Sequence, residues 1–267
     1  MTETGTGEFA VRSTGIDGAG TLRAWWKFDE GAGTTATDSS GNGHTLTATG
    51  DPGRSVGGTV PGAVAFDGVS QWLSTEGPVL RTDQSFSVAA WVRLDATTTA
   101  GDIDLPAGQY AIAAVAQDGP SHSPFYLGAR KVLDGQTTGA PEAPLRWDFT
   151  VAPIDGAVTG TIEWPHAAAG PVQPALGEWV LLVGIYDLDA GTATLVVPGA
   201  GDVVTVPLPE GWPQWHAEGG VQLGRARYLD KVSDLWPGSV GPVRIFSGVL
   251  TAEDAAELYR NDTVPES

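Results

Sequence analysis

The sequence predicts an all-β fold in which two antiparallel sheets stack as a sandwich, with one short helix near the C-terminus. Short apolar alternations recur from Leu22 onward, and Gly, Pro, Asp and Ser separate them at intervals of roughly 8 to 12 residues. A chain of 267 residues can form one large sandwich domain. We therefore expect a single domain over residues 21–262, a flexible N-terminal tail or linker over 1–20, and a C-terminal tail over 263–267.

The strands are predicted from segments in which apolar side chains alternate with a period of two. Residues 85–94 show the pattern best, because every second side chain from Phe86 to Leu94 is apolar and falls on one face. A strand of this kind needs a partner sheet to cover that face. The predicted strands are residues 62–66, 85–94, 110–117, 125–128, 145–151, 179–186, 192–197, 203–208, 221–224 and 241–246.

One segment near the C-terminus carries its own helix start signal. Thr251 is followed three residues later by Asp254, which resembles a capping box, and acidic residues occupy the first turn. Leu250 and Ala255 can form a hydrophobic staple, and Leu258 continues the apolar stripe. We expect this helix to pack on the edge of the sandwich.

The charge and composition exclude several classes of function. The formal net charge is −18, and acids outnumber bases in both halves of the chain, which repels nucleic-acid backbones and anionic lipid. No stretch approaches the ~18 apolar residues needed to cross a membrane. Cysteine is absent, so disulfides and thiol catalysis are excluded. The four histidines, at positions 44, 122, 166 and 216, are too scattered for a short zinc motif and are expected in loops or at a rim.

Nine of the ten tryptophans fall into two groups by their surroundings. One group lies in predicted strands and is expected in the core: Trp25, Trp26, Trp91, Trp147 and Trp179. The other group lies beside proline in predicted loops: Trp164, Trp212, Trp215 and Trp236. A loop indole can stack on a sugar or anchor a protein partner, although a Pro-Trp lid over the core is the alternative. Residues 211–216 are the best candidate recognition loop, and the predicted ligand-binding residues are Trp212, Trp215 and Trp164.

Several motifs occur in a fixed order along the chain, namely residues 26–31, 38–43, 65–68, 86–92, 177–179, 222–224, 243–246 and 250–253. Together they resemble the bacterial laminin-G-like jelly-roll domains of the concanavalin A-like lectin and glucanase superfamily. The resemblance runs from about residue 22 to 260. It implies a jelly roll of two large antiparallel sheets, with ligand loops at one rim or a ligand site on a concave face. It also implies a domain used mostly for recognition or assembly.

A structural calcium ion is a further expectation. Calcium takes about 6 to 8 oxygen ligands, and loops of acids and glycines supply them. Asp38 and Asp67 lie in such loops and are the predicted metal ligands, although both can instead shape Asx turns. The chain has Gly241-Pro242 where the family commonly has an Asp before Val-Arg-Ile, so one acidic position is missing.

The sequence lacks the carboxylate pattern of a glycoside hydrolase. Catalytic relatives of this fold carry Glu-x-Asp-x-Glu or Glu-x-Asp-x-x-Glu on one strand, which places the carboxylates on the same face. The nearest patterns here are Asp102-Ile103-Asp104 and Asp187-Leu188-Asp189, and both adjoin predicted turns. We therefore predict that the protein is not an enzyme.

These observations predict a non-catalytic recognition or adhesion module that binds carbohydrate. The alternative is a structural surface or fibre component of a virion, contractile particle or cell envelope that binds protein partners, and a glycoside hydrolase is third. Neither nucleic acid nor membrane insertion is expected. The first eight residues lack the basic and apolar regions of a secretory signal, while the function predicts a location at a cell or particle surface.

Overall fold

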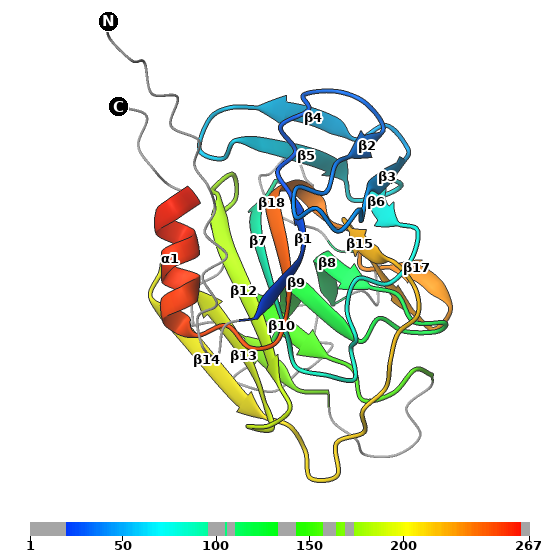
Figure 1. Ribbon diagram of the computed structural model, residues 1–267, viewed down its shortest axis with the longest axis vertical. Coiled ribbons are helices and arrows are strands. Elements are labelled where there is room, and N and C mark those ends of the chain that lie inside the picture. The colour runs from blue at the N-terminus through cyan, green and yellow to red at the C-terminus, as the bar shows by residue number, and fades with distance from the viewer. Residues whose placement is uncertain are drawn as a thin grey trace, which may run out of the picture.

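The computed structural model describes residues 20–95, 105, 110–132, 143–156, 164–168 and 174–262. Two eight-stranded antiparallel sheets face each other, and a short helix packs on one of them (Figure 1). The predicted fold class is therefore confirmed. Apart from Gly20, the two predicted tails lie outside the described residues. None of the helices in the described part of the chain is long and apolar enough to cross a membrane.

The first sheet joins the two ends of the described chain, because β1 (Thr21–Trp26) pairs with β18 (Pro237–Ser247). Strand β18 also pairs with β7 (Phe86–Leu94) in the middle of this sheet. The strands of the main path are, in spatial order, β14 (Asp202–Pro207), β13 (Thr192–Val197), β12 (Val180–Asp187), β7, β18, β5 (Gly62–Asp67) and β4 (Gly53–Val56).

The second sheet forms the other layer of the sandwich. Its spatial order is β11 (His166–Ala168), β10 (Leu145–Val151), β9 (Phe125–Lys131), β8 (Ala111–Gln117), β15 (Val221–Leu223), β6 (Trp72–Thr75), β3 (Leu46–Thr49) and β2 (Thr35–Ala36). A separate hairpin follows β15 and consists of β16 (Ala226–Tyr228) and β17 (Lys231–Ser233).

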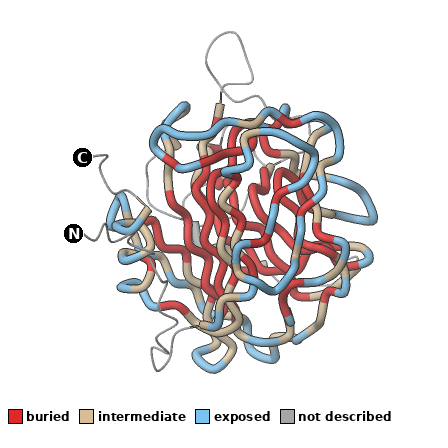
Figure 2. The backbone as a smooth tube through the Cα atoms, turned by 45° about the horizontal axis from the view of Figure 1, so that its top comes forward, coloured by how far each residue is buried: buried red, intermediate tan, exposed pale blue. Residues whose placement is uncertain are grey.

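Strand β7 has apolar side chains on both faces, so it is buried from two sides. Alternate residues from Phe86 to Leu94 fill the core between the sheets, as the sequence predicts. The intervening Ala89 and Trp91 belong to a second buried cluster together with Leu250 and Ala255 beside the helix. Figure 2 shows the buried backbone in the middle of the molecule, with exposed loops around it.

The C-terminal helix α1 (Ala252–Asp262) begins and packs as predicted. The Asp254 N–H donates to Thr251 Oγ1 at 3.1 Å, and Asp254 Oδ2 accepts from the Thr251 N–H at 2.7 Å, which completes the capping box. At the other end, Asp262 accepts two hydrogen bonds from the Arg244 guanidinium, each 2.7 Å long, and one from Trp91 Nε1 at 2.9 Å. These contacts fasten the helix to β7 and β18.

Candidate functional site on the outer face of the second sheet

One face of the second sheet is turned away from the first sheet, and we term it the outer face. Phe149 of β10 and Leu127 of β9 point into the core, so the residues next to them on each strand point outward. This alternation gathers polar side chains on β9, β10 and β11, namely Tyr126, Arg130, Asp148, Thr150 and His166. The polar and ionisable side chains of β9, β10 and β11 therefore gather on the outer face of the second sheet.

The β16–β17 hairpin lies across this face. The Tyr126 hydroxyl donates to the Arg227 carbonyl oxygen at 2.7 Å, and the Ala113 N–H of β8 donates to the Asp234 carbonyl oxygen at 2.8 Å. Ala226 of the hairpin packs against Ala113 and Tyr126 in a small buried cluster. The hairpin is thus held to the sheet at both of its ends.

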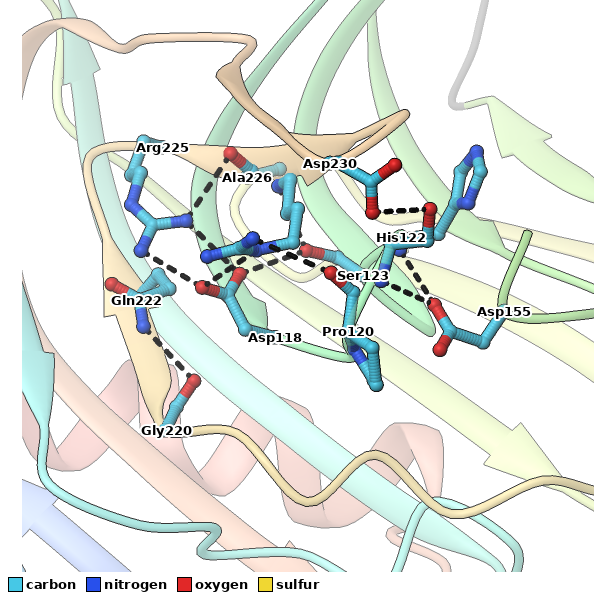
Figure 3. Close-up of polar contacts among 12 residues, drawn as sticks. Asp118, Pro120, His122, Ser123, Asp155, Gly220, Gln222, Arg225, Ala226 and Asp230 are labelled. Atoms are coloured by element: carbon cyan, nitrogen blue, oxygen red, sulfur yellow. Dashed lines mark hydrogen bonds and ion pairs between the residues drawn. The ribbon is translucent and has the colours of Figure 1, made fainter. Parts of the chain in front are cut away.

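A buried ionic network fixes the start of this hairpin (Figure 3). Both carboxylate oxygens of Asp118, just after β8, contact the Arg225 guanidinium, at 3.0 Å and 2.8 Å. Arg227 Nε lies 3.4 Å from the same carboxylate. Asp118 and Arg225 are both buried, so water is excluded from the pair. The two parallel contacts make the pair bidentate, which fixes the orientation of the guanidinium.

The loop that follows Asp118 holds a neutral histidine. Asp155 accepts the backbone N–H groups of Ser121 and His122, each at 2.7 Å, which fixes the loop. The Gly156 N–H donates to His122 Nδ1 at 3.1 Å, so this nitrogen is an acceptor and the proton of the neutral ring lies on Nε2. Burial lowers the pKa of His122 despite the nearby charges of Asp155 and Asp230.

Four rings meet at this end of the outer face, and we term them the aromatic cluster: Tyr126, His122, Trp164 and Tyr228. The His122 ring lies 4.9 Å from the Tyr228 ring and 5.8 Å from the Trp164 ring, in edge-to-face arrangements. His122 and Tyr126 are buried, whereas Trp164 is half-buried and Tyr228 is 44% exposed. Two of the four rings can therefore contact a ligand, and the other two support them.

A charged group lies beside the aromatic cluster on β9, β10 and β11. Asp148 Oδ2 contacts Arg130 Nε at 3.1 Å and accepts from the Thr150 hydroxyl, which also contacts His166 Nδ1 at 2.6 Å. Burial acts to raise the pKa of Asp148, but the hydrogen bond and charge of His166 and the charge of Arg130 outweigh it and lower the pKa to about 2. This carboxylate stays ionised and orders the surrounding donors.

The predicted recognition loop, residues 211–216, closes one end of the sandwich. Trp212 Nε1 donates to the Tyr186 hydroxyl at 2.8 Å, and Trp215 Nε1 donates to the Ala152 carbonyl oxygen at 3.0 Å. Both rings are half-buried and border a hollow with about 220 Å³ of empty space, including the part open to solvent. The space that a water-sized molecule can enter is only about 10 Å³, room for about one water molecule, so this geometry favours the interpretation of a lid over the core.

The structure brings Trp215 and Trp164 to the two sides of one loop. The Trp215 ring packs against Gly119, where an added Cβ would lie 2.7 Å from the ring, and Trp164 contacts His122 of the same loop. Trp212 lies further away, against Tyr186 of the first sheet. Their roles as ligand-binding residues stay predictions.

The structure corrects or completes three placements made from the sequence. Trp236 lies in the predicted loop, directly before β18, and is fully buried and stacked on Trp147 with ring centres 6.4 Å apart, which is the alternative of a Pro-Trp lid over the core. His166 lies in strand β11 rather than in a loop. His122 is in a loop but is buried beneath the hairpin.

The two predicted calcium ligands already bind backbone donors. Asp38 accepts the N–H groups of Trp25, Ser40 and His44 at 2.8 to 3.0 Å. Asp67 Oδ1 accepts three N–H groups of the following turn, those of residues 69–71. Within the described ranges, no three acidic or histidine side chains are grouped closely enough to hold a metal ion. This arrangement is that of Asx turns, and calcium binding by Asp38 and Asp67 stays a prediction.

Gly241, at the position where an acid is common, lies in a bulge of β18. A Cβ there would lie 3.1 Å from Trp91 Cβ and 3.2 Å from a Val60 methyl group. An aspartate would therefore crowd the cluster beneath the helix.

Calcium binding is tested by comparing thermal melts in millimolar calcium and in chelator. A site formed by Asp38 or Asp67 would stabilise the protein by about 2.7 kcal/mol at a hundredfold excess of calcium over its Kd. We expect coincident melts, because both carboxylates already accept several hydrogen bonds from the backbone of their own turns. A rise of several degrees in calcium, lost in the Asp67→Asn variant, would restore the predicted site.

Residues 67–256 match the family model Laminin_G_3, described as the concanavalin A-like lectin/glucanases superfamily. The chain belongs to this superfamily. No curated protein sequence matches the chain significantly.

Several solved structures resemble most of the chain in fold. Domain 4 of AbnA, a GH43 extracellular arabinanase from Geobacillus stearothermophilus solved with arabinotriose, aligns with TM-score 0.60 and 17% identity, covering 90% of this chain and 98% of that domain. The receptor-binding domain of botulinum neurotoxin mosaic serotype C/D aligns with TM-score 0.59 and 12% identity, and Trypanosoma rangeli sialidase with 0.53 and 15%. The matches cover 90% of this chain but only 51% and 33% of those two chains, so at these identities they show the fold alone.

Proposed function

We propose that this domain is a non-catalytic module that binds carbohydrate on the outer face of the second sheet. The observation that carries the proposal is the aromatic cluster, in which Trp164 and Tyr228 are accessible while His122 and Tyr126 hold them from beneath. Aromatic faces bind the C–H faces of sugars, and a rigid platform limits the entropy lost on binding. The arabinotriose complex of AbnA domain 4 makes arabino-oligosaccharides sensible first ligands.

The positions of the described carboxylates favour a binding module over a hydrolase. Asp187 Oδ1 accepts the Ala190 N–H in the turn after β12, so it shapes a hairpin. Asp102 and Asp104 lie outside the described residues. Asp148 is 2% exposed and its Oδ2 contacts Arg130, so it is out of reach of a glycosidic bond. A hydrolase needs two accessible carboxylates about 5 to 9.5 Å apart.

Isothermal titration with arabinotriose and other neutral oligosaccharides tests the proposal. Tyr228→Ala and Trp164→Ala are each expected to weaken binding about tenfold or more, since each removes a ring from the platform. Leu229→Ala is the matched control, because Leu229 is 45% exposed on the same hairpin but has no ring. The proposal is wrong if no neutral oligosaccharide binds, or if Tyr228→Ala binds as tightly as Leu229→Ala.

A protein partner is the second candidate, as expected for a surface or fibre component of a virion, contractile particle or cell envelope. It is favoured by three exposed apolar side chains on the hairpin, Tyr228, Leu229 and Val232, which are 42% to 45% exposed. Protein interfaces use such side chains around an aromatic anchor. In this case Leu229→Ala would weaken the complex as well as Tyr228→Ala.

A further inference from the structure

The β6 side of the outer face carries a tryptophan that lies apart from the aromatic cluster. Leu73 of β6 is fully buried in the core, so its neighbours Trp72 and Ser74 point to the outer face. Strands β8 and β15 lie between β6 and the β9–β11 part of the sheet that bears Tyr126. Trp72 is half-buried, and its cross-strand partner Thr49 on β3 is exposed.

Two buried polar groups beside Trp72 lack hydrogen-bond partners. Gln222, opposite Ser74, donates from Nε2 to the Gly220 carbonyl oxygen at 3.1 Å, but its Oε1 has no partner among the described residues. The Arg225 guanidinium lies 5.5 Å from the centre of the Trp72 ring, and its Nε is likewise unpartnered within the described part of the chain. Figure 3 shows the Gln222 amide oxygen pointing away from Asp118.

The free-energy penalty of leaving these two buried polar groups without hydrogen bonds suggests that a ligand supplies their partners. Gln222 is 4% exposed and Arg225 is 6% exposed, so water has little access to either. A buried donor or acceptor without a partner destabilises the folded protein, and native structures contain few of them. One acceptor and one donor next to a half-buried indole are the groups that recognise a sugar hydroxyl and ring oxygen.

The electrostatics indicate which kind of sugar fits. Asp118 binds the Arg225 guanidinium at both oxygens, so the positive charge beside Trp72 is already compensated. The exposed neighbours on β2 and β3 carry hydroxyl groups, at Thr35, Thr47 and Thr49. The whole protein has a formal net charge of −18, which repels anionic polymers.

We propose that Trp72, Gln222 and Arg225 form a second sugar-contacting surface, which selects neutral residues over uronic or sialic acids. In the complex the half-buried Trp72 ring turns aside from Arg225, which opens both buried groups to the ligand. The sugar C–H face packs on the Trp72 indole, a hydroxyl donates to Gln222 Oε1, and Arg225 Nε donates to a sugar oxygen. The inference rests on the proposed carbohydrate-binding function, and it extends the bound glycan to a second contact beyond the aromatic cluster.

Indole N–H resonances of ¹⁵N-labelled protein test this surface directly. The Trp72 resonance is assigned from its absence in Trp72→Phe, and that of Trp164 from Trp164→Phe. The probes are neutral oligosaccharides of arabinose, xylose, glucose, galactose and mannose, with trigalacturonate as the acidic comparison. We expect the Trp72 resonance to shift with at least one neutral probe and not with trigalacturonate. Gln222→Leu removes the acceptor and is expected to raise the midpoint of that shift about fivefold or more.

Trp25 is the matched control, because it is also half-buried beside an arginine, with Arg244 at 4.7 Å, but lies on the first sheet. Its resonance should not move. A shift at Trp164 with none at Trp72 would overturn this inference and leave the proposed function standing. If neither the Trp72 nor the Trp164 resonance shifts with any probe, both this inference and the proposed function are wrong. An equal shift of the Trp72 resonance with trigalacturonate would refute the selectivity for neutral sugars.

Discussion

Replacing Asp118 with alanine is expected to lower the free energy of unfolding by about 3 to 5 kcal/mol, because the change leaves a buried guanidinium without its counter-charge. The Arg225 side chain is 7% exposed and loses both of its contacts to the carboxylate. The start of the hairpin would then detach from the end of β8. Urea denaturation monitored by tryptophan fluorescence measures the loss.

Asp83→Ala is the matched control for this change. Asp83 also binds an arginine, with Arg81 Nη2 at 2.6 Å, but the Arg81 side chain is 60% exposed. Exposed pairs contribute at most about 1 kcal/mol. An equal loss of unfolding free energy in the two variants would show that the buried Asp118–Arg225 ion pair stabilises the fold no more than an exposed pair does.

Asp262→Ala is the second change expected to have a large effect, again about 3 kcal/mol or more. It removes two hydrogen bonds from Arg244 and one from Trp91, at the end of the helix that covers the first sheet. The helix should become sensitive to proteolysis before the sandwich unfolds. Glu253→Ala breaks an exposed pair with Arg260 in the same helix and should leave proteolysis unchanged. Equal protection in the Asp262 variant would contradict the predicted role.

The longer strands could be predicted because their patterns are local. Each predicted segment forms a strand, and the alternation in β7 matches its core-facing residues. Strands such as β2 and β11 are too short to show a period, since they have two and three residues. The β16–β17 hairpin is equally short, and it is held by Asp118, 107 residues before Arg225. Such a contact leaves no signal in one sequence.

The candidate site was only partly predictable for the same reason. Trp164 could be singled out by its neighbouring proline, but the rings that support it, His122 and Tyr126, come from distant segments. Trp72 was missed although a signal existed, because the alternation of Trp72 and Ser74 with Leu73 places the indole opposite the core. Trp236 could be placed in a loop from its neighbouring proline, but that neighbour does not show whether the ring is exposed or, as found, buried directly before β18.

The most direct test of carbohydrate binding on the outer face is the structure of the domain with a bound neutral oligosaccharide. The expected result is a sugar on the outer face of the second sheet, with a ring against Trp164 or Tyr228. A sugar bound instead at the hollow beside Trp212 and Trp215, or on the first sheet, would contradict carbohydrate binding on the outer face.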